Sequence, residues 1–383
     1  MVIKIKELDG GLTEVQGVKA SGITKKGKGL AFIEGKGKIT GVFTKNKVKA
    51  APVRFTSSLL KNVDEIDNII LNSGCANAFT GEKGEKDVEW MSSLANGNTA
   101  ICSTGAIGTY IDREWIQEGF KETKSSLTTD RKGSKKAAEA IKTTDTFCKE
   151  IAVEGSGYRI GAIAKGSGMI EPNMGTMLAL IYTDLELGGQ ELDEFLKKSV
   201  RETFNLVVVD GETSTNDSAL LVSTGKSNKT HEGLEDEFQE NLTYVCRELA
   251  KMIAEDGEGS SKSITLKITK SKNREEARDA IKKILSSPLV KSAIYGSSPN
   301  LGRIIAALGR SKATFKEDEI EMYLDELKVI ENGNIIADQE DIKEKFDKED
   351  IKAKINLKAG NHSLEGWGCD LTPKYVEMNA GYI

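Results

Sequence analysis

The chain has 383 residues, of which 38% are hydrophobic and 30% are charged, and its formal net charge at pH 7 is −5. This length suffices for two modest domains or one large sandwich with a sizeable core. The slightly acidic balance provides no basic field for nucleic acid, so we expect small-molecule chemistry or a protein partner.

The first residues, MVIKIKELDGG, carry charges and lack the apolar core of a signal peptide, and no stretch approaches about 18 apolar residues. We therefore expect a cytoplasmic protein with no membrane partner. The five cysteines lie far apart without CxxC spacing, which predicts reduced thiols and neither a disulfide framework nor a zinc site. No cofactor or metal is expected. The two histidines, His231 and His362, are expected in exposed loops, so the most common general base is scarce.

Short apolar strands alternate with charged amphipathic helices, which predicts a mixed α/β protein with layered helices and sheets. The glycine-rich segments near residues 25 to 38 contain no complete phosphate-binding motif and are interpreted as solvated hairpin faces. Strands are expected at 69–71, 99–102, 160–164, 177–182, 206–209, 264–268 and 320–330. Helices are expected at 83–94, 113–124, 190–204, 234–253, 274–285 and 303–309. The charge-dense segment 317–354 is interpreted as a solvated hairpin region.

Six small polar loops recur along the chain, and several of them directly follow an apolar strand or a helix. They cover residues 72–81, 103–108, 142–147, 210–221, 256–262 and 298–303. Loops at strand ends are where α/β folds place backbone N–H groups and short hydroxyl side chains around a ligand. We interpret these loops as parts of a shared site.

Thr176 stands between a glycine-rich loop and an apolar strand, in the segment KGSGMIEPNMGTMLAL. The simple alternative is an ordinary threonine at a strand edge. If the bond between Gly175 and Thr176 is cut, however, Thr176 becomes an N-terminal residue whose α-amine can activate its own hydroxyl as a nucleophile. Glycine before the bond tolerates the backbone geometry of self-cleavage, and STG at residues 103–105 is a source of oxyanion donors.

The sequence resembles the ornithine acetyltransferase family, whose members are glutamate N-acetyltransferases of arginine biosynthesis. The resemblance rests on KGSGMIEPNMGTMLA, DGETSTNDSALL, SPLVKSAIYGSSPNLGR and GWGCDLTPKYVEMNAGY, and it runs from about residue 22 to the end. It implies a layered αββα sandwich of the autoprocessed N-terminal-threonine-nucleophile type. The α chain would be 1–175 and the β chain 176–383, with two copies of each in a heterotetramer.

The resemblance also implies the reaction and its residues. Thr176 takes the acetyl group from N-acetylornithine, releases ornithine and passes the acetyl group to glutamate, and some members accept it from acetyl-CoA. Matched position by position, Thr104 and Gly105 form the oxyanion hole, and the substrate contacts are Thr143, Lys165, Thr176, Glu258 and Asn379. By charge, Lys165 would bind a substrate carboxylate, and Glu258 would bind or steer a substrate amine.

Three positions depart from the family pattern. Gly175 replaces the usual alanine, Cys75 replaces a common asparagine, and the sequence ends at Ile383, one residue short of a threonine that the family uses in substrate binding. Two other functions stay open. One is a hydrolase with the same nucleophile, an amidase or aminopeptidase that gives the acyl group to water. The other is an uncleaved amino-acid-binding protein.

Overall fold

The computed structural model describes residues 5–171 and 177–381. The chain divides into two compact units, the first formed by residues up to Asn205 with Glu212–Leu249 and the second by Leu206–Gly211 with the residues from Ala250 onward. The predicted cleavage point after Gly175 lies outside the described residues and inside the sequence range of the first unit. The predicted α and β chains are therefore not separate compact units, and the split stays a prediction about covalent structure.

The first unit is built on a nine-stranded mixed sheet with the order β1-β6-β7-β8-β10-β3-β4-β5 and β2 paired to β3. Its strands are β1 (Lys6–Leu8), β2 (Lys19–Lys25), β3 (Lys28–Phe43), β4 (Glu65–Ser73), β5 (Thr99–Ser103), β6 (Lys149–Glu154), β7 (Arg159–Lys165), β8 (Leu178–Thr183) and β10 (Ser218–Ser223). Its helices are α1 (Ala51–Asn62), α2 (Gly81–Ser92), α3 (Arg113–Ser125), α4 (Arg131–Ile141) and α5 (Gly189–Glu202), with a 3-10 turn at Leu12–Glu14. The helix α6 (Glu235–Glu255) runs from this unit into the second.

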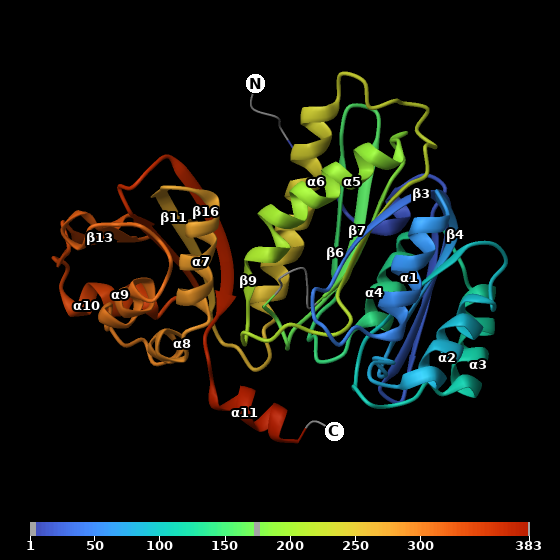
Figure 1. Ribbon diagram of the computed structural model, residues 1–383, viewed down its shortest axis with the longest axis horizontal. Coiled ribbons are helices and arrows are strands. Elements are labelled where there is room, and N and C mark those ends of the chain that lie inside the picture. Colours follow the sequence, from blue (N-terminus) through green and yellow to red (C-terminus); the bar gives the residue numbers. More distant parts are fainter. Residues whose placement is uncertain (1–4, 172–176, 382–383) are drawn as a thin grey trace. The chain divides into compact units, whose positions relative to one another are not determined.

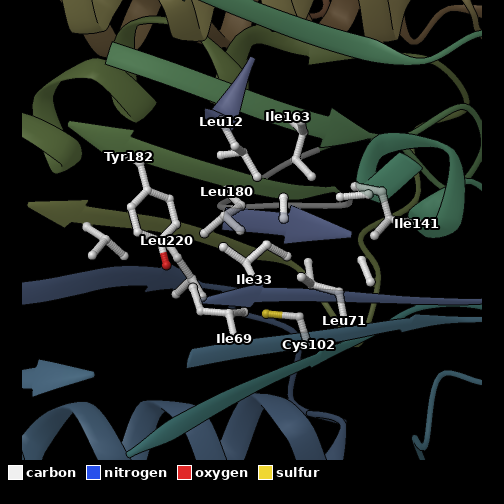
Figure 2. Packing of buried hydrophobic residues seen from close by; sticks show 14 of the residues in the cluster. Leu12, Ile33, Ile69, Leu71, Cys102, Ile141, Ile163, Leu180, Tyr182 and Leu220 are labelled. Atoms are coloured by element: carbon white, nitrogen blue, oxygen red, sulfur yellow. The ribbon is translucent and has the colours of Figure 1, made fainter. Parts of the chain in front are cut away.

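The long strand β3 bends this sheet into two facing halves. Its register with β4 shifts between Glu34 and Gly37, and beyond that irregularity β3 also pairs with β10. Leu71 of β4 and Ile163 of β7 consequently belong to one buried cluster. Figure 2 shows these side chains in the space between two sets of strands. A β-bulge is the ordinary way to bend a strand and close a sheet over its own core.

Helices cover the outer faces of this folded sheet. A second buried cluster joins Phe32 and Ile70 of the strands to Ile116 and Phe120 of α3 and to residues of α1 and α2. The helix α5 contacts β3 and β10. Figure 1 shows α5 and α1 to α3 on different sides of these strands. The expected α/β sandwich is therefore confirmed for this unit.

The interpretation of the segment near residues 25 to 38 as solvated hairpin faces is only half right. A hairpin does join β2 and β3, but residues Leu30 to Ile33 are buried in its second strand. The glycines here allow α4 to approach closely: a Cβ on Gly22 would lie 2.2 Å from the Lys136 carbonyl oxygen, and one on Gly29 would lie 1.9 Å from that of Ala140. Gly22 in β2 and Gly29 in β3 therefore reflect close backbone approach and not solvation.

The second unit contains a seven-stranded sheet with the order β14-β13-β12-β15-β11-β16-β9. Its strands are β9 (Val207–Val208), β11 (Ser263–Ser271), β12 (Glu321–Leu324), β13 (Leu327–Glu331), β14 (Asn334–Ile335), β15 (Asp350–Asn356) and β16 (His362–Cys369). Its helices are α7 (Arg274–Leu285), α8 (Pro288–Tyr295), α9 (Gly302–Gly309), α10 (Gln339–Phe346) and α11 (Pro373–Ala380). Two further 3-10 turns lie at Phe204–Leu206 and Glu317–Glu319.

Three expectations for the second unit need correction. The segment 320–330 is not one strand but a hairpin, because the chain turns at Asp325, whose φ is 51°. The charge-dense segment 317–354 is not merely solvated, since it also contains α10, whose Ile342 and Phe346 are buried. His362 begins β16 and is exposed, so it is not a loop residue. None of the described helices is long and apolar enough to cross a bilayer.

Candidate active site

Lys165 is the centre of a group of candidate residues in the first unit. It ends β7, is 7% exposed, and its Nζ donates to Oγ1 of Thr143 at 2.9 Å and to Oγ1 of Thr104 at 3.2 Å. Lysine is a donor only, so each hydroxyl accepts from it and keeps its own proton for another acceptor. The ammonium group thus orients two hydroxyl donors, a role that its charge alone did not reveal.

The position of Lys165 in the sheet connects this group to the predicted nucleophile. Lys165 pairs across the sheet with Leu178, the first residue of β8. Thr176 and Gly175 lie outside the described residues, but Thr176 is two positions before Leu178 in the chain. The apolar run predicted at 177–182 does form β8, and it begins beside Lys165.

The predicted oxyanion residues follow the end of β5. The backbone N–H of Thr104 donates to the carbonyl oxygen of Asn72 at 2.9 Å, so that N–H is already used. The N–H of Gly105 has no acceptor among the described residues, and the hydroxyl of Thr104 keeps its proton free. The donors available for an oxyanion are therefore the Gly105 N–H and the Thr104 hydroxyl.

Gly105 has to be glycine for two reasons. Its φ is +128°, where L side chains are strained, and an added Cβ would lie 2.4 Å from the carbonyl carbon of Gly74 and 2.5 Å from the nitrogen of Cys75. Cys75 forms isolated bridges with Thr104 and Ala106, and its Sγ interacts with Thr109. The Cys75 backbone thus shapes the oxyanion loop, and its thiol contacts the outer part of that loop.

Asn216 connects the predicted loop 210–221 to the loops at 72–81 and 103–108. Its Nδ2 donates to the carbonyl oxygens of Ala76 at 2.6 Å and of Ser103 at 2.8 Å. Four of the six predicted loops, those at 72–81, 103–108, 142–147 and 210–221, are therefore joined by direct hydrogen bonds or through Lys165. The idea of a shared site is supported for these four.

Asp145 holds the backbone around Thr143 and Lys165 in place, and the sequence analysis did not single it out. Its Oδ1 accepts from Lys149 at 2.8 Å and from the Gly166 N–H at 2.7 Å, and its Oδ2 accepts from the Thr143 N–H at 3.1 Å. Burial would raise the pKa of this carboxyl, but the charges of Lys165 and Lys149 and these hydrogen bonds hold the pKa at about 2. Its position two residues after Thr143 in TTDT was the available signal.

Glu258 and Asn379 belong to the second unit. Asn379 is exposed on α11, and its Nδ2 donates to Oε2 of the half-buried Glu258 at 2.9 Å. The loop carrying Glu258 is held near α11 by the Thr372 hydroxyl, which donates to the Gly259 carbonyl oxygen at 2.6 Å. Of the two remaining predicted loops, 256–262 contacts the residue just before 298–303, since Lys262 Nζ donates to Ser297 Oγ at 2.7 Å.

Comparison with known proteins identifies the family. The sequence model of the ArgJ family matches residues 14–383. A glutamate N-acetyltransferase of Methanosarcina acetivorans is 44% identical, over 99% of this chain and 100% of that protein. The arginine biosynthesis bifunctional protein ArgJ of Caldanaerobacter subterraneus is 40% identical, over 98% of this chain and 99% of that protein.

A solved structure supports the same family assignment. The crystal structure of the arginine biosynthesis bifunctional protein ArgJ from Bacillus halodurans is 35% identical, with a TM-score of 0.50, and the match covers 52% of this chain and 96% of that one. The resemblance seen in the sequence is confirmed, and the chain belongs to the ArgJ family.

Proposed function

We propose that the protein is a glutamate N-acetyltransferase that moves the acetyl group of N-acetylornithine to glutamate through an acetyl ester on Thr176. The position of Lys165 carries the proposal. Lys165 orients the hydroxyls of Thr104 and Thr143 and lies opposite Leu178, two residues after the nucleophile. The relatives named glutamate N-acetyltransferase support glutamate as the acetyl acceptor.

The chemistry follows from the donors described above. Once the bond before Thr176 is cut, its α-amine, with an ordinary pKa of about 7.7 to 8.0, accepts the proton of the Thr176 hydroxyl. The hydroxyl oxygen attacks the acetyl carbonyl carbon, and the Gly105 N–H and the Thr104 hydroxyl stabilise the negative oxygen that forms. Ornithine leaves with the proton, and the amine of glutamate then takes the acetyl group. Thr143, Lys165, Glu258 and Asn379 are the proposed substrate contacts.

The proposal includes cleavage before Thr176 and an assembly of two α and two β fragments. The crystal chain from Bacillus halodurans corresponds over nearly its whole length to about half of this chain, as a cleaved polypeptide would. The shared sheet supports survival of the cut fold, because β7 precedes the cleavage point and β8 follows it, yet the two strands pair. Native mass spectrometry tests the stoichiometry.

The decisive experiment combines denatured mass with acetyl transfer. The purified protein should give two fragments, the second beginning TMLAL, whereas Thr176→Ala should stay as one 41.6 kDa chain without activity. Incubation with N-acetylornithine and glutamate should give ornithine and N-acetylglutamate in equal amounts. An uncut wild type with full activity would exclude the mechanism.

The same assay separates the alternatives. A hydrolase would release acetate at one rate with or without glutamate, and an uncleaved binding protein would give neither fragments nor turnover. Replacing N-acetylornithine by acetyl-CoA tests whether acetyl-CoA is a second acetyl donor. We propose that no bound cofactor or metal is needed, so dialysis against a chelator should leave the rate unchanged. Cytoplasmic location is part of the proposal, and cell fractionation tests it.

A further inference from the structure

A polar cavity lies at one end of the nine-stranded sheet of the first unit. Its volume is about 470 Å³, and it is lined by residues 36–38, 65, 186–187 and 223–226. Ser223, the last residue of β10, pairs with Lys38 of β3 on one side and with Thr183 of β8 on the other. The cavity therefore lies where β8 and β10 end.

This cavity is separate from the candidate active site. Lys165 pairs with Leu178 at the other end of β8, and Leu178 pairs with Ser218, the first residue of β10. From Ser218 to Ser223 an extended strand spans about 17 Å. None of the described residues proposed for acetyl transfer lines the cavity. A small ligand bound here would therefore not contact the group around Lys165.

The lining contains charged side chains that lack an ionic partner. One pair is internal, because Nζ of Lys36 lies 3.4 Å from Oε2 of Glu65. Lys38, Lys226 and Glu186 form no ion pair within the part of the chain that the structure describes. Lys38 is half-buried, whereas Lys226 and Glu186 are exposed. The cavity thus offers a ligand two ammonium groups and one carboxylate.

Glycines shape the walls that carry these groups. A Cβ on Gly37 would lie 2.2 Å from the Ser223 carbonyl oxygen, so β3 and β10 approach closely beside the cavity. Gly225 has a φ of +63°, a turn conformation that favours glycine and directly precedes Lys226. The stem of Lys226 packs on Gly17, where an added Cβ would lie 3.0 Å from its Cγ. The position of Lys226 is therefore fixed by packing as well as by the turn.

A second cavity, of about 350 Å³, shares two of the lysines with the first. Its carboxylates already have partners. Glu34 Oε1 accepts from Lys19 Nζ at 2.8 Å, and Asp67 Oδ2 accepts from the Asn98 N–H at 2.9 Å. The carboxylate that is open to a ligand is therefore the one in the first cavity.

We infer that the first cavity is a second ligand site, and that it takes a small acidic α-amino acid such as glutamate or aspartate. Such a molecule carries two carboxylates and one ammonium group, which match Lys38, Lys226 and Glu186 in number and are opposite in charge. Hydrogen bonds between charged groups are the strong ones, and the volume lies in the range of small-molecule sites. The inference does not depend on acetyl transfer, since it uses none of the residues proposed for that reaction.

Hydrogen exchange of the whole protein, read by mass spectrometry, locates the binding. L-Glutamate should slow amide exchange in peptides covering 34–39 and 222–228. L-Glutamine and glutarate each lack one of the charged groups, so each should need at least about tenfold higher concentration for the same effect. Lys226→Glu and Glu186→Gln should each raise the L-glutamate concentration at half effect by at least about tenfold. Both side chains are exposed, so both variants should fold and transfer acetyl groups at the wild-type rate.

The matched control is Lys229→Glu. It makes the same charge change at an exposed lysine three positions further along, outside the cavity lining, and should leave the effect of L-glutamate unchanged. An equal loss in Lys229→Glu and Lys226→Glu would contradict a defined site, because net charge alone would then decide binding.

The other outcomes are equally clear. Unchanged exchange of both peptides at every L-glutamate concentration would overturn the inference, and so would the same slowing by sodium sulfate, which would show that any anion binds. Slowing confined to peptides covering 72–81 and 103–108 would exclude this second site and leave the proposed function standing. Slowing of the cavity peptides in a protein that transfers no acetyl group would do the reverse.

Discussion

The candidate residues of the two units differ in how firmly the protein holds them. In the first unit, Lys165 is 7% exposed and its hydroxyl partners belong to a chain of hydrogen bonds that ends on a buried ion pair. In the second unit, Asn379 is exposed, and a hydrogen bond to Glu258 links the two candidates. Buried, mutually bonded donors are preorganised for developing charge, whereas surface side chains must be ordered by the ligand. Substitutions should therefore disturb fold and activity together in the first unit, and activity alone in the second.

Gly105→Ala should have the largest effect. The added methyl group would meet the backbone of Gly74 and Cys75, and relief of that overlap must move the oxyanion loop. We expect self-cleavage and acetyl transfer to fall about 100-fold or more, which is the usual cost of losing one oxyanion donor. Both rates can be measured by mass spectrometry.

The control for this variant is Gly108→Ala in the same loop. Gly108 also has positive φ, at +80°, but an added Cβ would meet nothing within 4 Å. It should cost about 1 to 2 kcal/mol of stability from backbone strain and leave cleavage intact. Equal loss of cleavage in both variants would show that strain, and not the position of the donors, decides the rate.

Asp145→Asn should have the next largest effect. It breaks a pair in which both side chains are 0% exposed and removes the charge of Asp145 from beside the buried Lys149. Such losses cost about 3 to 5 kcal/mol. Urea unfolding should show this loss of stability. Because Thr143 and Lys165 are then held less firmly, acetyl transfer should slow as well.

The control is Glu82→Gln. It removes the same kind of i,i+4 contact, to Lys86 at 2.8 Å, from the exposed surface and should cost less than about 0.5 kcal/mol. Similar losses in the two variants would contradict the distinction.

Acid should weaken the same part of the first unit. The pKa of Asp145 is lowered to about 2, so its contribution is complete above the unfolded value of about 3.9 and disappears as pH falls through 2. The shift corresponds to about 2 kcal/mol. In urea titrations, the free-energy difference between wild type and Asp145→Asn should shrink by about that amount between pH 6 and pH 2. A difference independent of pH would show that the carboxyl group is not held ionised.

The sequence predicted the elements that local patterns define. The segment 274–285 is helical as expected, with Asn273 capping the Glu276 N–H, and the apolar run after Thr176 is a strand. It did not reveal α4, whose buried side chains include the small Ala137 and Ala138. That helix is defined by its approach to Gly22 and Gly29, which are more than 100 residues away in the chain. Its buried positions do recur at helical spacing, but all except Ile141 are glycine, serine or alanine, so a search for large apolar residues misses them.

The residues of the candidate site also fall into those that the sequence predicted and those that it did not. Thr104, Gly105, Thr143 and Lys165 came from motifs, and the structure brings three of these four into direct contact. Asp145 was inside a quoted motif but had no assigned role, because an aspartate in a loop gives no sign of its burial or partners. The pKa of Asp145 is lowered mainly by Lys165, which the pairing of β6 with β7 brings near, and by Lys149, four residues along the chain.

The smallest effects are expected in the second unit. Glu258→Gln and Asn379→Ala should each change the free energy of unfolding by less than about 0.5 kcal/mol, because their shared hydrogen bond is near the surface. If both contact substrate, each should raise KM for N-acetylornithine by about three- to tenfold, the size of one hydrogen bond. Glu377→Gln, on the same helix α11 and exposed, controls for loss of charge and should change neither quantity. Large destabilisation by either variant would show that the second unit holds its residues as firmly as the first.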